Sequence, residues 1–459
     1  MSRALLFLLS VSAALAYVRN VTPNGIPLAR RDASNIQFQV GPSVRAGALN
    51  ADGFPVITAG SDPAAALAAA AATWSGVPGS IVRFAPLQPS LQENNPNDAR
   101  QTITAADTAE TRSLVGPYLA VTVWSYTDDG AMLDADVILN PSLTEGANHV
   151  AFSTDRSPGT YDLESVVTHE FGHALGANHS GILSASMFQG TLEFSSFTTP
   201  AEATAQGTLS ADDVAFLVSA YPAASAPGDF GRITGRVRFD NGAPVRGALV
   251  TAVDADAGVA VGALAGLADG GYTISGVPPG RYQVYAQPLD GPVVPGSLGL
   301  ASGSVDAGFR TTFFGGNGAP ASLAVGAGGA AAADIVVDSA PSTMHIDRLG
   351  TAPVGGSEWA WASIKAVVSG SACDVLVWVR GIDAGVAPEQ VRLLGPGVTL
   401  RPGSLRLQPD GAIDGVVPLR MTVDVAPRNA RAQVTLAVVN GADAAANSAG
   451  LVLLPASAP

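Results

Sequence analysis

The sequence is poor in cysteine, which excludes disulfide bonds as a source of stability. Cys373 is the only cysteine among 459 residues, so no internal disulfide can form. A chain without disulfides relies on buried apolar surface or on bound metal. Cys373 lies in the strand-like run SACDVLVWV, and we expect it to be a small buried residue.

Positive charge is also scarce. Lys and Arg number 24 against 38 Asp and Glu, which gives a formal net charge of −14. Nucleic acids and anionic membranes bind proteins through clustered Lys and Arg that displace counterions, so neither is expected as a partner. The remaining composition is globular, with 47% hydrophobic residues. The length suggests about two to four domains.

Long apolar runs are missing except near the start. The run from Ala4 to Leu15 follows Arg3 and leads to the small residue Ala16. This pattern is typical of a signal peptide, and the run is shorter than the ~18 residues that a membrane anchor needs. We therefore expect residues 1–16 to be a signal peptide that is cleaved near Ala16. The protein would be secreted, and the mature chain would contain no integral membrane segment.

The rest of the chain divides by its patterns. Residues 17–225 mix helix and strand signals, whereas the later sequence consists of short alternating strands separated by Gly and Pro. We place the boundary in YPAASAPGDFG, residues 221–231. The prediction is a multidomain protein, with an α+β domain at 17–225 and two all-β sandwich domains at 230–340 and 343–459.

Helix and strand signals in the first domain are specific enough to place elements. Three helices are predicted, beginning near Ser61 or Asp62, near Asp162 and near Ser210. The second of these helices should end at Gly176. Strands rich in Val, Ile and aromatic residues are predicted at residues 81–85, 118–126 and 134–140.

Histidine is rare as well, yet it is concentrated. Three of the five histidines, His169, His173 and His179, lie in THEFGHALGANHSG. On a helix, residues four apart lie one above the other, so His169 and His173 would stand about 6 Å apart on one side. Two imidazoles supply half of a tetrahedral zinc shell.

The residues around these histidines complete a possible site. Gly176 can adopt the left-handed conformation that ends a helix and turns the chain back, which would bring His179 to the same ion. The fourth position would remain open for water. Glu170 lies about 100° around the helix from His169, so it would stay outside the ligand shell and act as the general base for that water.

The full pattern resembles the metzincin zinc proteases. HExxH alone recurs by chance, but HExxHxxGxxH fixes five residues in register. HEFGHALGANHS, together with DLESVVTHEFGHALGANHSG and GTLSADDVAFLVSAYP, is similar to the matrixin branch over about residues 60–222. A thermolysin-like zincin is a weaker alternative, because its third ligand would be a distant glutamate.

The resemblance implies a fold and a set of roles. It implies a twisted, mostly parallel sheet over an active-site helix, and protein or peptide substrates that pair with an edge strand, here about Leu119 to Tyr126. It makes Met187 the methionine-turn residue beneath the metal. Asp212 and Asp213 match a pair that ties down the mature N-terminus and this turn, although both also fit simple charge complementarity at a helix start.

Some features depart from the family. No cysteine precedes the catalytic region in this sequence, so we expect no thiol latch of the kind that a family pro-domain supplies. His149 stands alone, and no second zinc site is predicted. An acidic cluster is a weak calcium candidate whose spacing matches no defined loop, and it comprises Asp128, Asp129, Asp134 and Asp136.

The later sequence resembles a known module too. GRV, GALV, GGYTISGVPPGRYQVYA and TTFFGGNGAPASLAVGAGG are similar to the carboxypeptidase regulatory-like domain, a transthyretin-like sandwich. Residues 343–459 are predicted to be an immunoglobulin-like sandwich. The leading hypothesis is a secreted zinc endopeptidase. The alternative is an exported adhesive or binding protein, in which the sandwiches carry the function and the first domain has weak activity or none.

Overall fold

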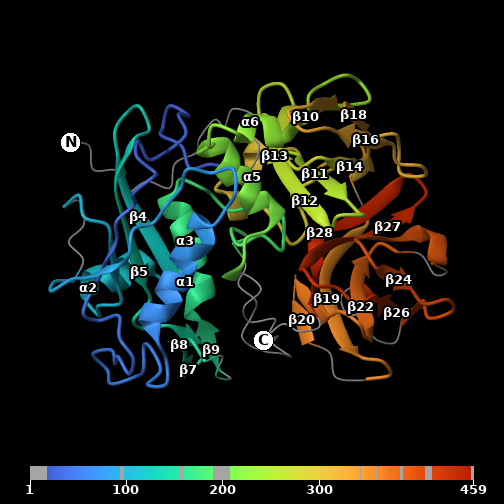
Figure 1. Cartoon of the computed structure of the whole chain (residues 1–459). Coiled ribbons are helices and arrows are strands. Elements are labelled where there is room, and N and C mark those ends of the chain that lie inside the picture. The colour runs from blue at the N-terminus through green and yellow to red at the C-terminus, as the bar shows by residue number, and fades with distance from the viewer. Residues whose placement is uncertain are drawn as a thin grey trace.

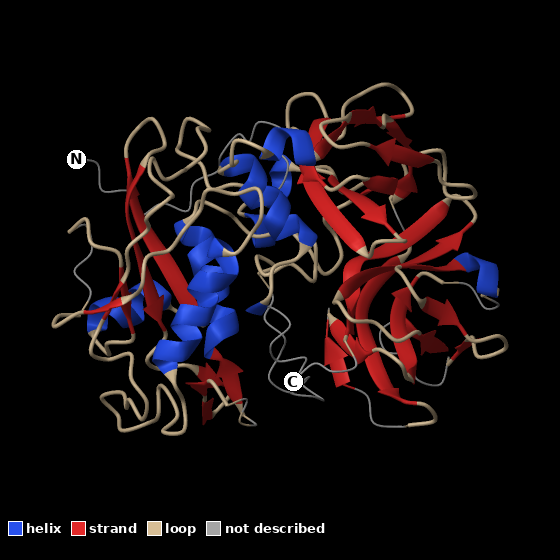
Figure 2. Cartoon of the chain, viewed as in Figure 1, coloured by secondary structure: helices blue, strands red, loops and turns tan. Residues whose placement is uncertain are grey.

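The computed structural model describes residues 18–93, 98–155, 157, 159–189, 207–341, 343–356, 360–362, 364–382, 386–408 and 416–455. The predicted signal peptide lies outside these residues. Figures 1 and 2 show helices and a small sheet in one half of the molecule and strands in the other.

A five-stranded sheet forms the base of the first region. Its order is β2-β1-β3-β5-β4, and only the β4–β5 pair is antiparallel. The strands are β1 (Gln39–Val40), β2 (Gln88–Pro89), β3 (Thr102–Thr104), β4 (Ala120–Tyr126) and β5 (Met132–Leu139). The mostly parallel sheet agrees with the expected topology, and β4 at the sheet edge coincides with the predicted edge strand.

Two short ladders lie beyond β5. They are formed by β6 (Thr144–Glu145) with β7 (Asn148–His149) and by β8 (Ala151–Ser153) with β9 (Thr160–Asp162). Strand β9 leads directly into the helix that carries two of the histidines.

The helices begin at the residues that the capping signals indicate. Helix α1 (Pro63–Ser75) starts after Asp62, whose carboxylate accepts the Ala65 N–H at 3.1 Å, and Pro63 occupies its first turn. Helix α3 (Leu163–Ala174) starts after Asp162, and α5 (Ala211–Ala220) starts after Ser210. Helices α1 and α3 pack together in Figure 1, with Trp74 fully buried between them.

Two details of the sequence prediction were wrong. Residues 81–85 form only an isolated bridge, Ile36 with Phe84, because the N–H groups of Ile81 and Arg83 bind the carbonyls of Tyr221 and Ala33 instead of a neighbouring strand. Helix α2 (Ala109–Val115) was not predicted, since seven residues are too few to show a helical period.

A mostly β-sandwich region follows the short helix α6 (Ala226–Asp229). Its first two sheets share one buried cluster. One contains β10 (Gly231–Phe239), β13 (Gly271–Val277), β17 (Ala330–Ala332) and β18 (Ile335–Val337). The other contains β11 (Leu249–Asp254), β12 (Val259–Leu264), β14 (Gly280–Gln287), β15 (Thr312–Phe313) and β16 (Ser322–Val325). A long connection after β14 holds the 3₁₀ turns η3 (Pro295–Leu298) and η4 (Ser302–Ser304).

Two further sheets share another buried cluster near the end of the chain. One contains β19 (His345–Pro353), β20 (Ala360–Ala362), β22 (Ala372–Arg380), β24 (Val398–Leu400), β25 (Arg406–Leu407) and β26 (Val416–Val425). The other contains β21 (Lys365–Val368), β23 (Val391–Leu394), β27 (Ala432–Asn440) and β28 (Asp443–Leu454), with the turn η5 (Pro388–Gln390) before β23. Cys373 is buried in this region, and burial raises the pKa of its thiol to about 12.

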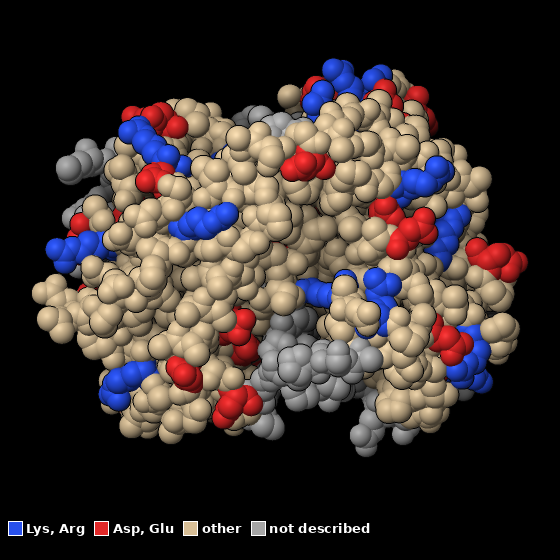
Figure 3. Space-filling view, in the orientation of Figure 1, with Lys and Arg blue, Asp and Glu red and all other residues tan. Residues whose placement is uncertain are grey.

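The segment after His179 lies where all these parts meet. Leu183 is buried in an apolar cluster that contains Leu249 of β11 and Val452 of β28. Ile182 is buried in a second apolar cluster, which contains other residues of the same two strands. The first region and the β-sandwich region therefore share cores. Figure 3 shows acidic and basic side chains scattered over one face of the described residues, without a large field of one sign. No helix among the described residues is long and apolar enough to span a membrane.

Candidate metal centre

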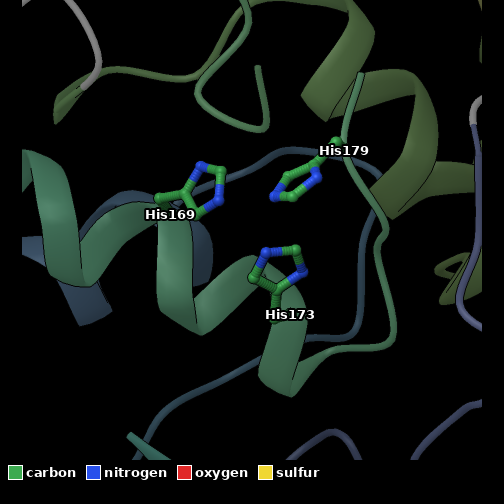
Figure 4. Close-up of side chains that lie close together, drawn as sticks. All are labelled: His169, His173 and His179. Atoms are coloured by element: carbon green, nitrogen blue, oxygen red, sulfur yellow. The ribbon is translucent and has the colours of Figure 1, made fainter. Parts of the chain in front are cut away.

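The three histidines of the sequence motif converge in space. His169 and His173 lie one turn apart on α3, and His179 follows the helix end. The ring centroids are separated by 4.7 Å for His169 and His173, 5.3 Å for His169 and His179, and 4.9 Å for His173 and His179. One potential ligand nitrogen from each ring lies within 4.8 Å of the others. Figure 4 shows the rings facing a common centre.

The return of the chain to this centre depends on Gly176. Its φ is +89°, in the left-handed region that a glycine occupies without strain. A Cβ atom there would stand 2.4 Å from the carbonyl oxygen of Leu28, so only glycine fits. The Gly176 N–H donates to the His173 carbonyl at 2.9 Å and closes the last turn. The end of α3 and the bend at Gly176 together place His179 next to the two histidines of α3.

Each ring uses its Nδ1 atom for a main-chain carbonyl. His169 donates to Ser186 O at 2.7 Å, His173 to Ala177 O at 2.9 Å and His179 to Ser297 O at 2.9 Å. A carbonyl oxygen only accepts, so Nδ1 carries the proton in all three rings and Nε2 keeps its lone pair.

The charge state of the rings also suits a metal. Burial lowers the pKa of His169 to about 4 and the pKa of His179 to about 3. The pKa of His173 is lowered well below its ordinary value by burial and by the two neighbouring histidines. Three neutral imidazoles, each held from behind by a carbonyl, fit the requirements of a zinc ligand set.

Glu170 lies beside the histidines and is fixed by strand β4. Its Oε2 accepts the Thr122 hydroxyl at 2.7 Å, and the same hydroxyl donates to the Glu170 carbonyl at 3.0 Å. Trp124 of β4 donates its indole N–H to His173 O at 3.0 Å. Burial raises the pKa of the Glu170 carboxyl to about 7, although the bond from Thr122 opposes this shift. A carboxyl group with such a pKa can both take and release a proton near neutral pH.

The turn that contains Met187 closes the site from below. Met187 is buried and packs against Gly172 of α3. A Cβ atom added to Gly172 would stand 2.1 Å from the Met187 sulfur, so a side chain there would collide with it. Asp213 holds this turn, because its carboxylate accepts the N–H groups of Ser186 at 2.8 Å and of Met187 at 3.1 Å. Ser186 in turn supplies the carbonyl that orients His169.

Asp212 connects the loop after His179 to the β-sandwich region. Its carboxylate accepts the Ser180 hydroxyl at 2.6 Å and the Gly262 N–H of β12 at 2.8 Å. The expected mature N-terminus at residue 17 lies outside the described residues, so the tie between that end and the Asp212–Asp213 pair that the resemblance implies stays a prediction. The described part of the N-terminal segment reaches the loop after α3, since the Asn20 amide donates to Ala177 O at 2.6 Å.

Several contributing residues were not recognised from the sequence. Thr122 and Gly172 carry no signal of their own in a strand and a helix. Trp74 of α1 has no pattern that marks it for the site, yet its indole N–H donates to Thr168 O of α3 at 2.8 Å. Ser297 lies 118 residues beyond His179, and no local pattern connects the two.

The predicted acidic cluster is not brought together as a metal site. Asp128 and Asp129 are exposed, and Asp129 pairs with Arg31 at 2.9 Å, whereas Asp134 and Asp136 are buried in β5. Among the described residues, the three histidines are the only group of three or more such side chains that could hold a metal, so calcium is not supported.

Two other predictions on this region have simple outcomes. His149 stacks on Phe54, with ring centroids 3.6 Å apart. The family resemblance also places a wall of the substrate pocket at about Phe188 to Gly207, and this segment lies mostly outside the described residues.

Comparison with solved structures gives only weak likenesses. BcpA, the major pilin subunit of Bacillus cereus, is 11% identical over 49% of this chain and 69% of its own, with a TM-score of 0.15. The RrgB pilus protein of Streptococcus pneumoniae is 7% identical over 48% of this chain and 49% of its own, with a TM-score of 0.17. No curated protein matches the chain.

Two family models match the chain, one on each side of the predicted boundary. Residues 102–221 match the matrixin model, and residues 232–291 match the carboxypeptidase regulatory-like domain model. Matrixins are zinc-dependent, and the histidine triad is compatible with a zinc site. The matches confirm the predicted architecture, in which a matrixin region typical of metalloproteases precedes a carboxypeptidase regulatory-like domain.

Proposed function

We propose that the protein is a secreted zinc endopeptidase that cleaves peptide bonds with a zinc-activated water. The observation that carries the proposal is the convergence of His169, His173 and His179 through Nε2, with Glu170 held beside them. The matrixin match over the same residues supports it. Secretion rests on the predicted signal peptide alone.

The residues of the site would have three different roles, namely metal binding, proton transfer and positioning. His169, His173 and His179 would hold the ion. When bound, zinc lowers the pKa of a coordinated water and polarises the scissile carbonyl. Glu170 would accept the proton of that water and pass it to the leaving amine. The Thr122 hydroxyl keeps the carboxylate in place, so that little reorganisation is needed during proton transfer.

The β4 strand gives the substrate a place to bind. It lies at the edge of the sheet, next to α3, and pairs with β5 on one side only among the described strands. An extended peptide that pairs with its free edge would pass over the metal centre. Recognition through main-chain hydrogen bonds fits an endopeptidase with protein or peptide substrates.

Casein hydrolysis by the purified full chain tests this proposal. Activity should disappear with a chelator and return with zinc, and His179→Ala should abolish both zinc uptake and activity. The matched control is His149→Ala, which removes a histidine outside the centre and should leave both intact. Full chelator-resistant activity, or activity in His179→Ala equal to that of the control, would refute the proposal.

A further inference from the structure

The β-sandwich region reaches into the metal centre. The His179 ring receives its carbonyl partner from Ser297, in the turn η3 of that region, at 2.9 Å. The neighbouring Asn178 amide donates to Leu298 O at 3.4 Å, while the Asn178 side-chain oxygen accepts the His179 N–H at 2.7 Å. The His179 ring is therefore bound directly to η3, and the His179 N–H is linked to η3 through the Asn178 side chain.

The end of η3 explains why these carbonyls are available. The last carbonyls of a helical turn have no donor within the turn and point outward. Gly299 follows in the left-handed conformation, with φ at +69°, and ends the turn so that the carbonyls of Ser297 and Leu298 face the catalytic region. The turn is anchored by Leu298, which is 1% exposed in a cluster with Leu183 and Phe188.

Further contacts bind the segment after His179 to the last part of the chain. The Leu183 N–H donates to Ser448 O at 2.9 Å. Arg431, from the last part of the chain, donates to Ser184 O at 3.1 Å and to Thr208 O at 2.8 Å. The Ser186 hydroxyl also donates to Thr208 O, at 3.0 Å. Ser186 supplies the carbonyl that orients His169, so these hydrogen bonds link the last part of the chain to that histidine.

The junction is also close-packed. A Cβ atom on Gly181 would stand 2.6 Å from the Leu249 side chain, and one on Gly262 would stand 3.2 Å from Ile182. Close-packed surfaces move as a unit, so the β-sandwich region cannot shift without moving the loop that carries His179.

We propose that the β-sandwich region is part of the metal centre, in which the Ser297 carbonyl is the positioning group that holds the His179 ring in its Nδ1–H form and aims Nε2 at the ion. This inference rests on the proposed function. It goes beyond that function because it assigns the β-sandwich region a role in metal binding, through a turn that follows the residues matched to the carboxypeptidase regulatory-like domain.

Two full-length variants test the inference by zinc affinity. Gly299→Val places a branched side chain at a left-handed position and displaces the end of η3. Gly242→Val is the matched control, because Gly242 has φ at +85° in a turn of the same region and no atom within 4 Å of an added Cβ. The zinc dissociation constant, measured by chelator competition, should rise about tenfold or more for Gly299→Val and stay near the wild-type value for the control. Equal zinc affinity in the two variants overturns the inference.

A measurement on the unaltered chain guards against misfolding of the variant. The protein has five histidines, so ¹⁵N-histidine labelling gives few ring signals. In the zinc-loaded chain, the His179 Nδ1 proton should be observed and should exchange slowly with water. A ring bound through Nδ1, or an Nδ1 proton that exchanges rapidly, overturns the inference even if zinc is bound. Failure of the wild-type chain to bind zinc would instead reject the proposed function and this inference with it.

Discussion

Among individual residues, Glu170 separates catalysis from metal binding, because it lies beside the three histidines and is not one of the ligand group. Glu170→Gln keeps the size of the side chain and an oxygen for Thr122, but removes the base. We expect kcat to fall by about 10²-fold or more, with zinc content unchanged. Metal analysis and peptide hydrolysis on the same sample check this. Zinc-loaded Glu170→Gln with wild-type kcat would contradict the assigned role.

Asp136 provides a pH-dependent prediction away from the metal. Burial, with help from Asp134, raises the pKa of its carboxyl to about 8. In the unfolded chain the Asp136 carboxyl ionises with the usual pKa of about 3.9. Between about pH 3.9 and pH 8 the folded state therefore holds one proton more than the unfolded state. Its contribution to stability is therefore complete below about pH 3.9 and is lost as the pH rises through 8, at up to ~1.4 kcal/mol per pH unit.

Asp136→Asn should abolish this loss, because the amide cannot ionise and its oxygen can still accept the Thr102 N–H. Urea denaturation should give similar stability for variant and wild type at pH 4, and a more stable variant at pH 8. The exposed Asp129→Asn serves as the control. A wild-type advantage at pH 8 would show that Asp136 is ionised in the folded chain.

The residues that sequence reasoning found are those whose relation is local. His169, Glu170, His173, Gly176 and His179 lie within one helix and its bend, so their spacing alone fixes their geometry. The groups that orient them come from distant segments, as Thr122 and Ser297 show. A threonine in a strand or a main-chain carbonyl in a turn has no distinctive spacing, and only folding brings it to the site.

At the level of elements, the bend after α3 is the most sensitive point. Gly176→Ala would force a left-handed alanine and place its Cβ 2.4 Å from Leu28 O. We expect a loss of ~2 kcal/mol or more in the free energy of unfolding, together with weaker zinc binding. Gly146→Ala is the control, since Gly146 has φ at +59° and no atom within 4 Å of an added Cβ. Equal stability losses in the two variants would show that the bend tolerates a side chain.

Elements with strong end signals were predictable from the sequence. The caps Asp62, Asp162 and Ser210 mark helix starts because their side chains bind N–H groups in the first turn. The segment 81–85 was predicted as a strand because it is apolar, but its donors bind two separate segments. Strand formation depends on the partner, and composition does not reveal it.

For the whole molecule, the shared cores predict joint unfolding. Ile182 and Leu183 are buried among residues of both β-sandwich parts, so the first region cannot open without exposing surface in the others. Zinc at 100 times its dissociation constant should stabilise the folded chain by ~2.7 kcal/mol, and calorimetry should show the entire transition shifting. His179→Ala is the control that should not respond. Two transitions, of which zinc moves only one, would mean that the regions unfold independently.

The order of regions was predictable because composition changes sharply near residue 225, whereas their mutual contact was not. The segment GILSASMF after His179 has the composition of an ordinary loop, yet it lies at the meeting point of three cores. Interfaces inside one chain use the same apolar residues as cores, so the sequence does not distinguish them.

The proposed metal centre consists of one zinc ion held by three imidazoles. X-ray absorption at the zinc edge, on full-length protein after dialysis and metal quantification, tests it most directly. We expect one zinc per chain, with three imidazole nitrogens at about 2.0 to 2.1 Å and one oxygen ligand. Zinc that is absent or substoichiometric, or a shell with fewer than three imidazoles, would contradict it.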